Sequence, residues 1–136
     1  MQTGSFQSCG HLPNAVGISG RVPADFVVKP GEVEWYAAER NFFDRGGRYL
    51  RKLAPKYWIW ADYQVNHDNG LYTSRYEAEV LEKLDPEALV ADLGSDAILC
   101  CLEPPGWFCH RRVVADWLYT RMGLVVPEWL PPQVES

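Results

Sequence analysis

The residues best suited to carry out chemistry lie together between positions 101 and 111. Cys101, Glu103, Cys109, His110 and Arg111 all fall within this stretch. A thiol becomes a nucleophile when it loses its proton, an imidazole can take that proton, and a carboxylate can hold the imidazole in one tautomer. We therefore predict a site with Cys109 as nucleophile or anion-contacting thiol, His110 as general base or acid, and Glu103 as the orienting group.

The flanking elements should place these groups at the edge of a sheet. Residues 97–102 are continuously apolar, as expected of a parallel strand covered on both faces. After a loop with two prolines, an amphipathic helix is predicted from Cys109 to Met122. Unpaired backbone N–H groups and the helix dipole at its start, together with the cation of Arg111, favour a thiolate at Cys109. The same helix start and Arg111 would equally bind a phosphate.

The same side chains also allow purely structural interpretations. Cys109 can be a plain helix cap, and His110 can brace the loop by bonding to Glu103 or to the backbone. Glu103 can simply pair with Arg111. Cys101, near the end of its strand, can belong to the core or to the wall of the site. The sequence leaves these alternatives open.

A zinc site is the least favoured interpretation of the cysteines. It would combine Cys101, Cys109 and His110 with either Cys100 or Glu103. The Cys-x-x-Cys pairs typical of structural zinc do not occur, and adjacent ligands such as Cys109 and His110 rarely converge on one ion. The sequence also has no Gly-rich phosphate-binding loop, because Gly-Ile-Ser-Gly is too short to count as one. We therefore predict no metal and no cofactor.

The rest of the chain predicts an α/β fold. Strands are expected at 15–19 and 124–126, and a weakly helical pattern covers 32–43. A capping box at Ser74 predicts the start of one helix, and Asp85 followed by proline predicts the start of another. Helices alternating with apolar strands are typical of parallel crossover units. We expect a small three-layer Rossmann-like domain with a short, mainly parallel sheet.

Length and composition limit the class of protein further. The chain has 136 residues, of which 47% are hydrophobic and 23% charged, enough for one core but not for two. We therefore expect one domain over 1–136, with a loose N-terminal arm at 1–14 and a flexible tail at 131–136. The net charge of -5 excludes a uniformly basic nucleic-acid-binding surface. Neither a membrane span nor a signal peptide is predicted, and adjacent Cys100 and Cys101 suit a disulfide poorly, so we expect reduced thiols in a cytoplasmic protein.

Residues 40–60 interleave basic and aromatic side chains. Between 40 and 56 there are six basic residues and one acidic residue. Cations that neutralise phosphate and rings that stack on bases are features of nucleotide and single-strand binding. Equally, the rings can be core and the cations can be solvated. From this segment, Arg48 and Tyr49 are candidate substrate-binding residues.

Three motifs resemble the family catalogued as domain of unknown function 488. The most specific is Cys-x-Glu at a strand end followed by Cys-His-Arg at a helix start, formed by residues 101–103 and 109–111. The others are Ile-Ser with Arg and Pro at 18–23, and Arg-Tyr-x-x-Leu-Ala-Pro at 48–55. The resemblance implies a Rossmann-like α/β fold and no settled reaction. Residues 26–47 match no family pattern that we identify.

Two functions of different classes follow from these patterns. In the first, the protein is an enzyme acting on a phosphate- or nucleotide-containing substrate. Arg21 and Arg111 would then bind the substrate's anion, with Ser19 beside them and Cys101 in the wall of the site. In the second, the same cleft binds a nucleotide, a nucleic acid or an acidic protein partner without turnover. No membrane partner is expected, and the sequence specifies no oligomeric state.

Overall fold

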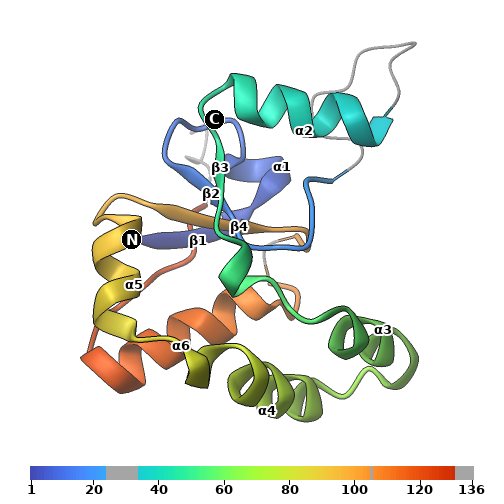
Figure 1. Ribbon diagram of the computed structural model, residues 1–136, viewed down its shortest axis with the longest axis vertical. Coiled ribbons are helices and arrows are strands. Elements are labelled where there is room, and N and C mark those ends of the chain that lie inside the picture. The colour runs from blue at the N-terminus through green and yellow to red at the C-terminus, as the bar shows by residue number, and fades with distance from the viewer. Residues whose placement is uncertain (24–33, 105, 131–136) are drawn as a thin grey trace, which may run out of the picture.

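The protein is built around a parallel sheet with helices on both faces (Figure 1). The computed structural model describes residues 1–23, 34–104 and 106–130. In these residues the sheet has four strands in the order β1-β4-β2-β3, and every neighbouring pair is parallel. The strands are β1 (Gln2–Ser5), β2 (Ala15–Gly17), β3 (Arg48–Tyr49) and β4 (Ile98–Cys101). The predicted three-layer α/β architecture with a parallel sheet is confirmed.

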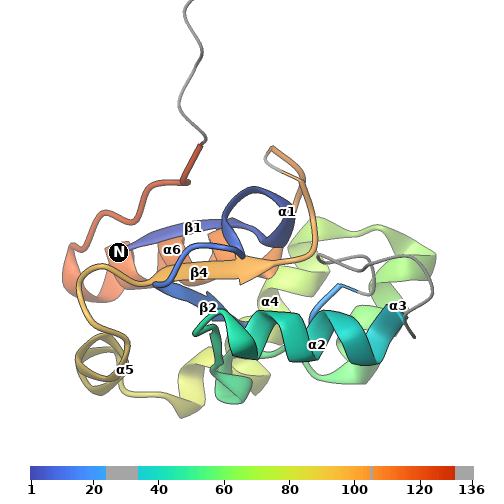
Figure 2. The same ribbon diagram turned by 90° about the horizontal axis from the view of Figure 1, so that it is seen from above.

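The helices divide between the two faces of the sheet (Figure 1 and Figure 2). One face is covered by α1 (Phe6–Cys9) and α2 (Glu34–Asp44). The opposite face is covered by α4 (Asn69–Glu79), α5 (Pro86–Leu93) and α6 (His110–Met122), with α3 (Tyr57–Asn66) packed beside α4. Two short 3-10 turns are η1 (Arg51–Leu53) and η2 (Leu81–Lys83). None of the helices in the described ranges is both long enough and apolar enough to cross a lipid bilayer.

Strand β4 contributes residues to both hydrophobic clusters of the core. All its residues are buried, and because side chains alternate along a strand, Leu99 and Cys101 join the cluster under α4, α5 and α6. Ile98 and Cys100 join the second cluster, which contains Phe6 and Phe42. A strand covered on both faces was predicted from the continuous apolar run.

Helix α5 begins as predicted, and helix α6 begins and ends as predicted. Asp85 caps α5 by accepting a hydrogen bond from the backbone N–H of Glu87 at 3.1 Å. Cys109 is the N-cap of α6, and Gly123 ends that helix in the left-handed region at φ 68°. Glycine adopts this conformation without the steric cost that a side chain adds. The weak helical pattern at 32–43 corresponds to α2.

The expectation of a loose N-terminal arm is wrong for residues 2–9. Strand β1 pairs with β4 along its full length, and Thr3 and Ser5 are buried. Strand β1 itself has no large apolar residue, because α1 turns back directly over it and Cys9 Sγ fills the space beside Gly4. The small and polar residues of this segment therefore belong to a closely packed edge of the sheet. From the sequence alone, the same residues predict a loose arm.

Two further element predictions need correction. The predicted strand at 124–126 does not form; within the described part of the chain, this region pairs with the sheet through an isolated bridge between Thr3 and Glu128. Pro127 interrupts this edge because proline has no backbone N–H to donate. The helix predicted to open at Ser74 opens earlier as α4, where the Asp68 carboxylate accepts from the N–H of Leu71 at 3.0 Å.

Candidate functional site

A cavity of about 460 Å³ opens beyond the carboxyl ends of β2 and β4. In a parallel α/β sheet this edge is where ligands usually bind. The segment after β2 contributes Ser19 and Arg21, the segment after β4 contributes Glu103, and the start of α6 contributes Cys109 and His110. The structure thus brings together five of the predicted site residues from three separate parts of the chain.

An aromatic wall completes the cavity. It is formed mainly by α3 and α4, together with the residue before Cys109, and its rings are Tyr57, Trp60, Tyr63, Tyr72 and Phe108. Tyr63, Tyr72 and Phe108 also pack on one another with centroids 5.3 to 5.4 Å apart. Tyr57 and Trp60 belong to the basic and aromatic segment at 40–60 that the sequence singled out, whereas Tyr63, Tyr72 and Phe108 were not predicted. The available signal is α3 itself, where four of the first seven residues are aromatic and Ile59 is the buried one.

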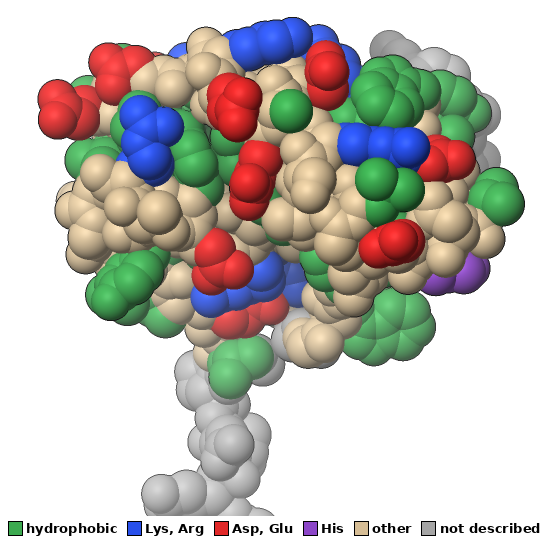
Figure 3. Space-filling view, turned by 90° about the horizontal axis from the view of Figure 1, so that it is seen from below, with side chains coloured by type: hydrophobic (Ala, Val, Ile, Leu, Met, Phe, Trp, Pro, Cys, Tyr) green, Lys and Arg blue, Asp and Glu red, His purple; other side chains and the backbone are tan. Residues whose placement is uncertain are grey.

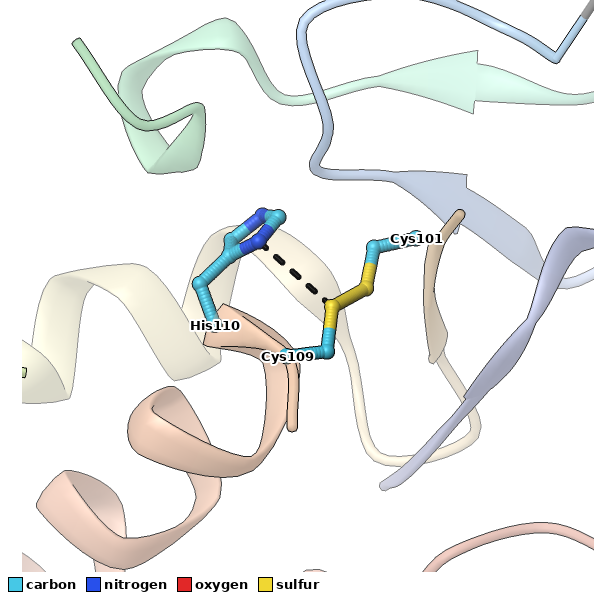
Figure 4. Close-up of side chains that lie close together, drawn as sticks. All are labelled: Cys101, Cys109 and His110. Carbon is cyan, nitrogen blue, oxygen red and sulfur yellow. Dashed lines mark hydrogen bonds between the residues drawn. A yellow bond between two sulfur atoms is a disulfide. The ribbon is translucent and has the colours of Figure 1, made fainter. Parts of the chain in front are cut away.

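Cys101 and Cys109 are joined as a disulfide across the loop between β4 and α6 (Figure 4). The expectation of reduced thiols is therefore not confirmed for these two cysteines. Adjacent Cys100 and Cys101 do not pair, because they face opposite sides of the sheet. Cys9 and Cys100 are free and buried in the second core cluster, where their sulfur atoms lie 3.4 Å apart.

His110 is buried and held in one tautomer by the backbone. Its Nε2 lies 2.6 Å from the carbonyl oxygen of Ile18. Because a carbonyl can only accept, Nε2 donates and the lone pair of the neutral ring is on Nδ1. Nδ1 lies 3.6 Å from Cys109 Sγ (Figure 4). Burial lowers the pKa of His110 to about 4, although the Ile18 carbonyl partly opposes this effect, so the imidazole is neutral near pH 7.

The sequence predicted that Glu103 orients His110, but the structure shows otherwise. The carbonyl oxygen of Ile18, and not Glu103, is the hydrogen-bond partner of His110 Nε2. Glu103 lies in the cavity wall, and its Oε2 is 3.9 Å from Cys101 Sγ. Burial raises the pKa of Glu103 above its usual value, against an opposing effect of hydrogen bonding to its own backbone and of the Arg111 charge. The carboxyl group therefore holds a proton more readily than an exposed glutamate does.

Arg111 does not line the cavity, so the expected anion contact is not formed. Its guanidinium is fully buried and donates to both carboxylate oxygens of Glu128, at 2.9 to 3.3 Å. It also donates to the carbonyl oxygens of Glu103 and Pro104, at 2.8 and 3.2 Å, and to Cys101 Sγ at 3.1 Å. Arg111 thus braces the loop behind the site. Nothing in the residues around 111 indicated the pairing with Glu128.

Arg48 and Tyr49 also lie outside the cavity. Arg48 donates to the carbonyl oxygens of Leu93 and Asp92, at 2.8 and 3.1 Å, and so ties β3 to the end of α5. The ring of Tyr49 packs edge-on against Phe42 in the second core cluster. The Arg-Tyr motif is therefore structural in this fold, and only the aromatic end of the basic segment reaches the site.

The outer surface shows no broad basic region on the side formed by α4 and α6. There, basic and acidic side chains are interspersed (Figure 3). This agrees with the exclusion of a uniformly basic coat. Arg21 is an exposed cation in the cavity lining, and the exposed Lys56 directly precedes α3.

Comparison with known proteins identifies one family. No curated protein and no solved structure matches the chain. A family model described as "Active DUF488-N3 subclade" matches residues 28–122, which run from just before α2 to the end of α6. The match includes most of 26–47, the stretch in which no family pattern was identified from the sequence. Because it covers well over half of the chain, the protein belongs to the DUF488 family, in its N3a subclade.

Proposed function

We propose that the protein is an enzyme that uses the reduced thiol of Cys109 as a nucleophile on a nucleotide-like substrate. The observation that carries the proposal is the placement of Cys109 and His110 side by side in the wall of one cavity, with Nδ1 facing Sγ at 3.6 Å. The description of the matched subclade as active agrees with an enzyme. Reduction of the disulfide by a thiol or phosphine precedes the reaction, since it frees the nucleophile.

The reaction would begin from a neutral pair. His110 Nδ1 takes the proton of the Cys109 thiol, while the Ile18 carbonyl holds the Nε2–H and stabilises the imidazolium that forms. Free backbone N–H groups at the start of α6 stabilise the negative sulfur. The sulfur then bonds to an electrophilic carbon or phosphorus of the substrate, and the leaving group departs with the proton that His110 holds. Water afterwards displaces the thiol and completes hydrolysis.

The cavity lining supports a substrate with a flat ring and a negative charge. Aromatic side chains such as Trp60 and Phe108 offer faces on which a base can stack. Arg21 is exposed at the same cavity and can pair with a phosphate. A volume of about 460 Å³ falls within the range of small-molecule sites and suits a mononucleotide.

Protection of a thiol tests this proposal directly. In reduced protein, we expect iodoacetamide to modify Cys109 and nucleoside phosphates to slow that modification. Arg21→Gln should weaken the protection. The matched control is Cys100→Ala, because Cys100 is buried in the other core cluster and away from the cavity. Turnover of a panel of nucleotides should be lost in Cys109→Ser and in His110→Gln. Absence of both protection and turnover would overturn the proposal.

A second candidate is a binding module that takes the same ligand without turnover. The disulfide favours it, because Cys109 is not free to react while it is bonded to Cys101. In that case nucleotide affinity should be equal in wild-type protein and Cys109→Ser, and no product should form. Comparing wild-type protein with Cys109→Ser for nucleotide affinity and for product formation therefore distinguishes the two functions.

A further inference from the structure

We infer that the reduced forms of Cys101 and Cys109, together with His110, constitute a binding site for zinc. The ligating atoms of these three residues all lie within 4.8 Å of one another, and all three residues are buried. Thiolate sulfur and imidazole nitrogen are the ligands that zinc prefers. The sequence argued against this site because adjacent residues rarely converge on an ion, but the backbone turn at the start of α6 directs both Cys109 and His110 toward Cys101 (Figure 4).

The distances agree with tetrahedral zinc. Bonds of about 2.3 Å to sulfur and about 2.0 Å to nitrogen place two such ligand atoms about 3.5 Å apart at a tetrahedral angle. Cys109 Sγ and His110 Nδ1 lie 3.6 Å apart. The two sulfur atoms must separate to about 3.8 Å, which requires reduction of the disulfide. The Cα atoms of the cysteines are already 7.4 Å apart, wider than in most disulfides, so the backbone does not need to open.

Hydrogen bonds behind these residues resemble the outer shell of a zinc site. A zinc-bound histidine usually donates its second ring N–H to a carbonyl or carboxylate. Here His110 donates Nε2–H to the Ile18 carbonyl at 2.6 Å, which leaves Nδ1 free for an ion. Arg111 donates to Cys101 Sγ at 3.1 Å, and a hydrogen bond of this kind stabilises a thiolate. The buried Arg111 also supplies positive charge beside two negative sulfur atoms.

The fourth position of the ion would face the cavity. Cys109 and His110 line that cavity, whereas Cys101 lies behind them. Three protein ligands with one open position are typical of zinc sites that exchange water for another ligand. Binding replaces two thiol protons, which are released to solvent, and no electrons are transferred. It also occupies both the sulfur and the nitrogen that the proposed reaction uses, so zinc would inhibit thiol chemistry at Cys109.

Cobalt and zinc titrations of the reduced, metal-stripped protein test the inference. We expect one Co²⁺ per chain, with the visible bands of tetrahedral cobalt and thiolate charge-transfer absorption, and we expect Zn²⁺ to displace it. Loss of an outer-shell partner usually costs 10- to 100-fold in affinity, so Cys101→Ser, Cys109→Ser and His110→Gln should each weaken Zn²⁺ binding by more than about 100-fold. Cys100→Ala, next to Cys101 but on the other face, should bind as wild type does.

Two measurements need no variant and therefore remain decisive if a variant fails to fold. Native mass spectrometry should find zinc on the reduced wild-type chain and none after reoxidation. Zinc should also slow alkylation of Cys109, and a chelator should restore the rate. The inference is overturned if reduced protein binds no more zinc than oxidised protein, or if the Cys101→Ser and Cys100→Ala variants bind equally well. These readouts do not depend on turnover, so failure of the proposed enzyme activity leaves them unaffected.

Discussion

Arg111 connects three segments around the site, through its bonds to Glu128, to the loop after β4 and to Cys101. The guanidinium is fully buried, so its removal takes the charged partner away from the Glu128 carboxylate, which keeps its hydrogen bond from Thr3. It also removes the side-chain donor to the carbonyl oxygens of Glu103 and Pro104. We expect Arg111→Met to lower the free energy of unfolding by about 3–5 kcal/mol, as measured by urea denaturation.

An exposed ion pair provides the control for this prediction. Lys52 and Asp92 lie 3.8 Å apart with about half of each side chain exposed. Lys52→Met should therefore change stability by less than about 1 kcal/mol. Equal losses in Arg111→Met and Lys52→Met would contradict the structural role assigned to Arg111.

Glu128 should make the protein sensitive to acid. Burial alone would raise the pKa of this carboxyl group, but hydrogen bonds from Arg111 and Thr3 outweigh burial and hold the pKa below its usual value. A carboxylate with a lowered pKa contributes stability that is present above its unfolded pKa and lost as the pH falls through its folded pKa. Between pH 6 and pH 3, the stability of wild-type protein should fall more steeply than that of Glu128→Gln. Parallel curves from denaturant titrations would show that the pair contributes nothing.

At the scale of elements, β1 and α1 should behave as core. Phe6 is fully buried and packs edge-on against Phe42 with ring centroids 5.4 Å apart. We expect Phe6→Ala to cost about 3–5 kcal/mol in unfolding free energy. The neighbouring Gln7 is exposed, so Gln7→Ala should change stability by less than about 0.5 kcal/mol. If this segment were a mobile arm, Phe6→Ala and Gln7→Ala would both change the unfolding free energy by small and similar amounts.

These elements show why part of the fold could be predicted from sequence. Strand β4, helix α5 and helix α6 carry their signals locally, in a continuous apolar run, an aspartate cap and a terminal glycine. Strand β1 forms through pairing with a strand nearly a hundred positions away, and its residues are small because α1 packs tightly on it. Nothing within the segment records that pairing, since propensity is a weak guide where tertiary contacts decide.

The candidate site also has parts that could be predicted from the sequence and parts that could not. The adjacency of Cys109 and His110, their place at a helix start and their distance from Cys101 along the chain are sequence properties, so the reacting groups could be predicted. The partner of His110 could not, because it is the backbone carbonyl of Ile18, and a carbonyl is present at every position. Arg111 was misassigned since its partner, Glu128, lies beyond the end of α6.

At the scale of the whole molecule, the two core clusters should unfold together, and we propose that the chain is a single domain. Neighbouring residues of β4 belong to different clusters, with Leu99 on one face and Ile98 on the other. Neither cluster can lose its strand without exposing the other, so unfolding should be a single cooperative transition.

The free cysteines allow unfolding on the two faces of the sheet to be measured separately. Cys9 and Cys100 belong to the cluster under α1 and α2, whereas far-UV circular dichroism is dominated by the longer helices around the opposite cluster. In a urea series, pulsed alkylation of Cys9 and Cys100 should have the same midpoint as the loss of helical signal. Alkylation of Cys9 and Cys100 at a clearly lower urea concentration would mean that α1 and α2 detach from the sheet first. The site draws on β2 and β4, which both clusters share, so a common midpoint would also mean that the cavity persists until the whole fold is lost.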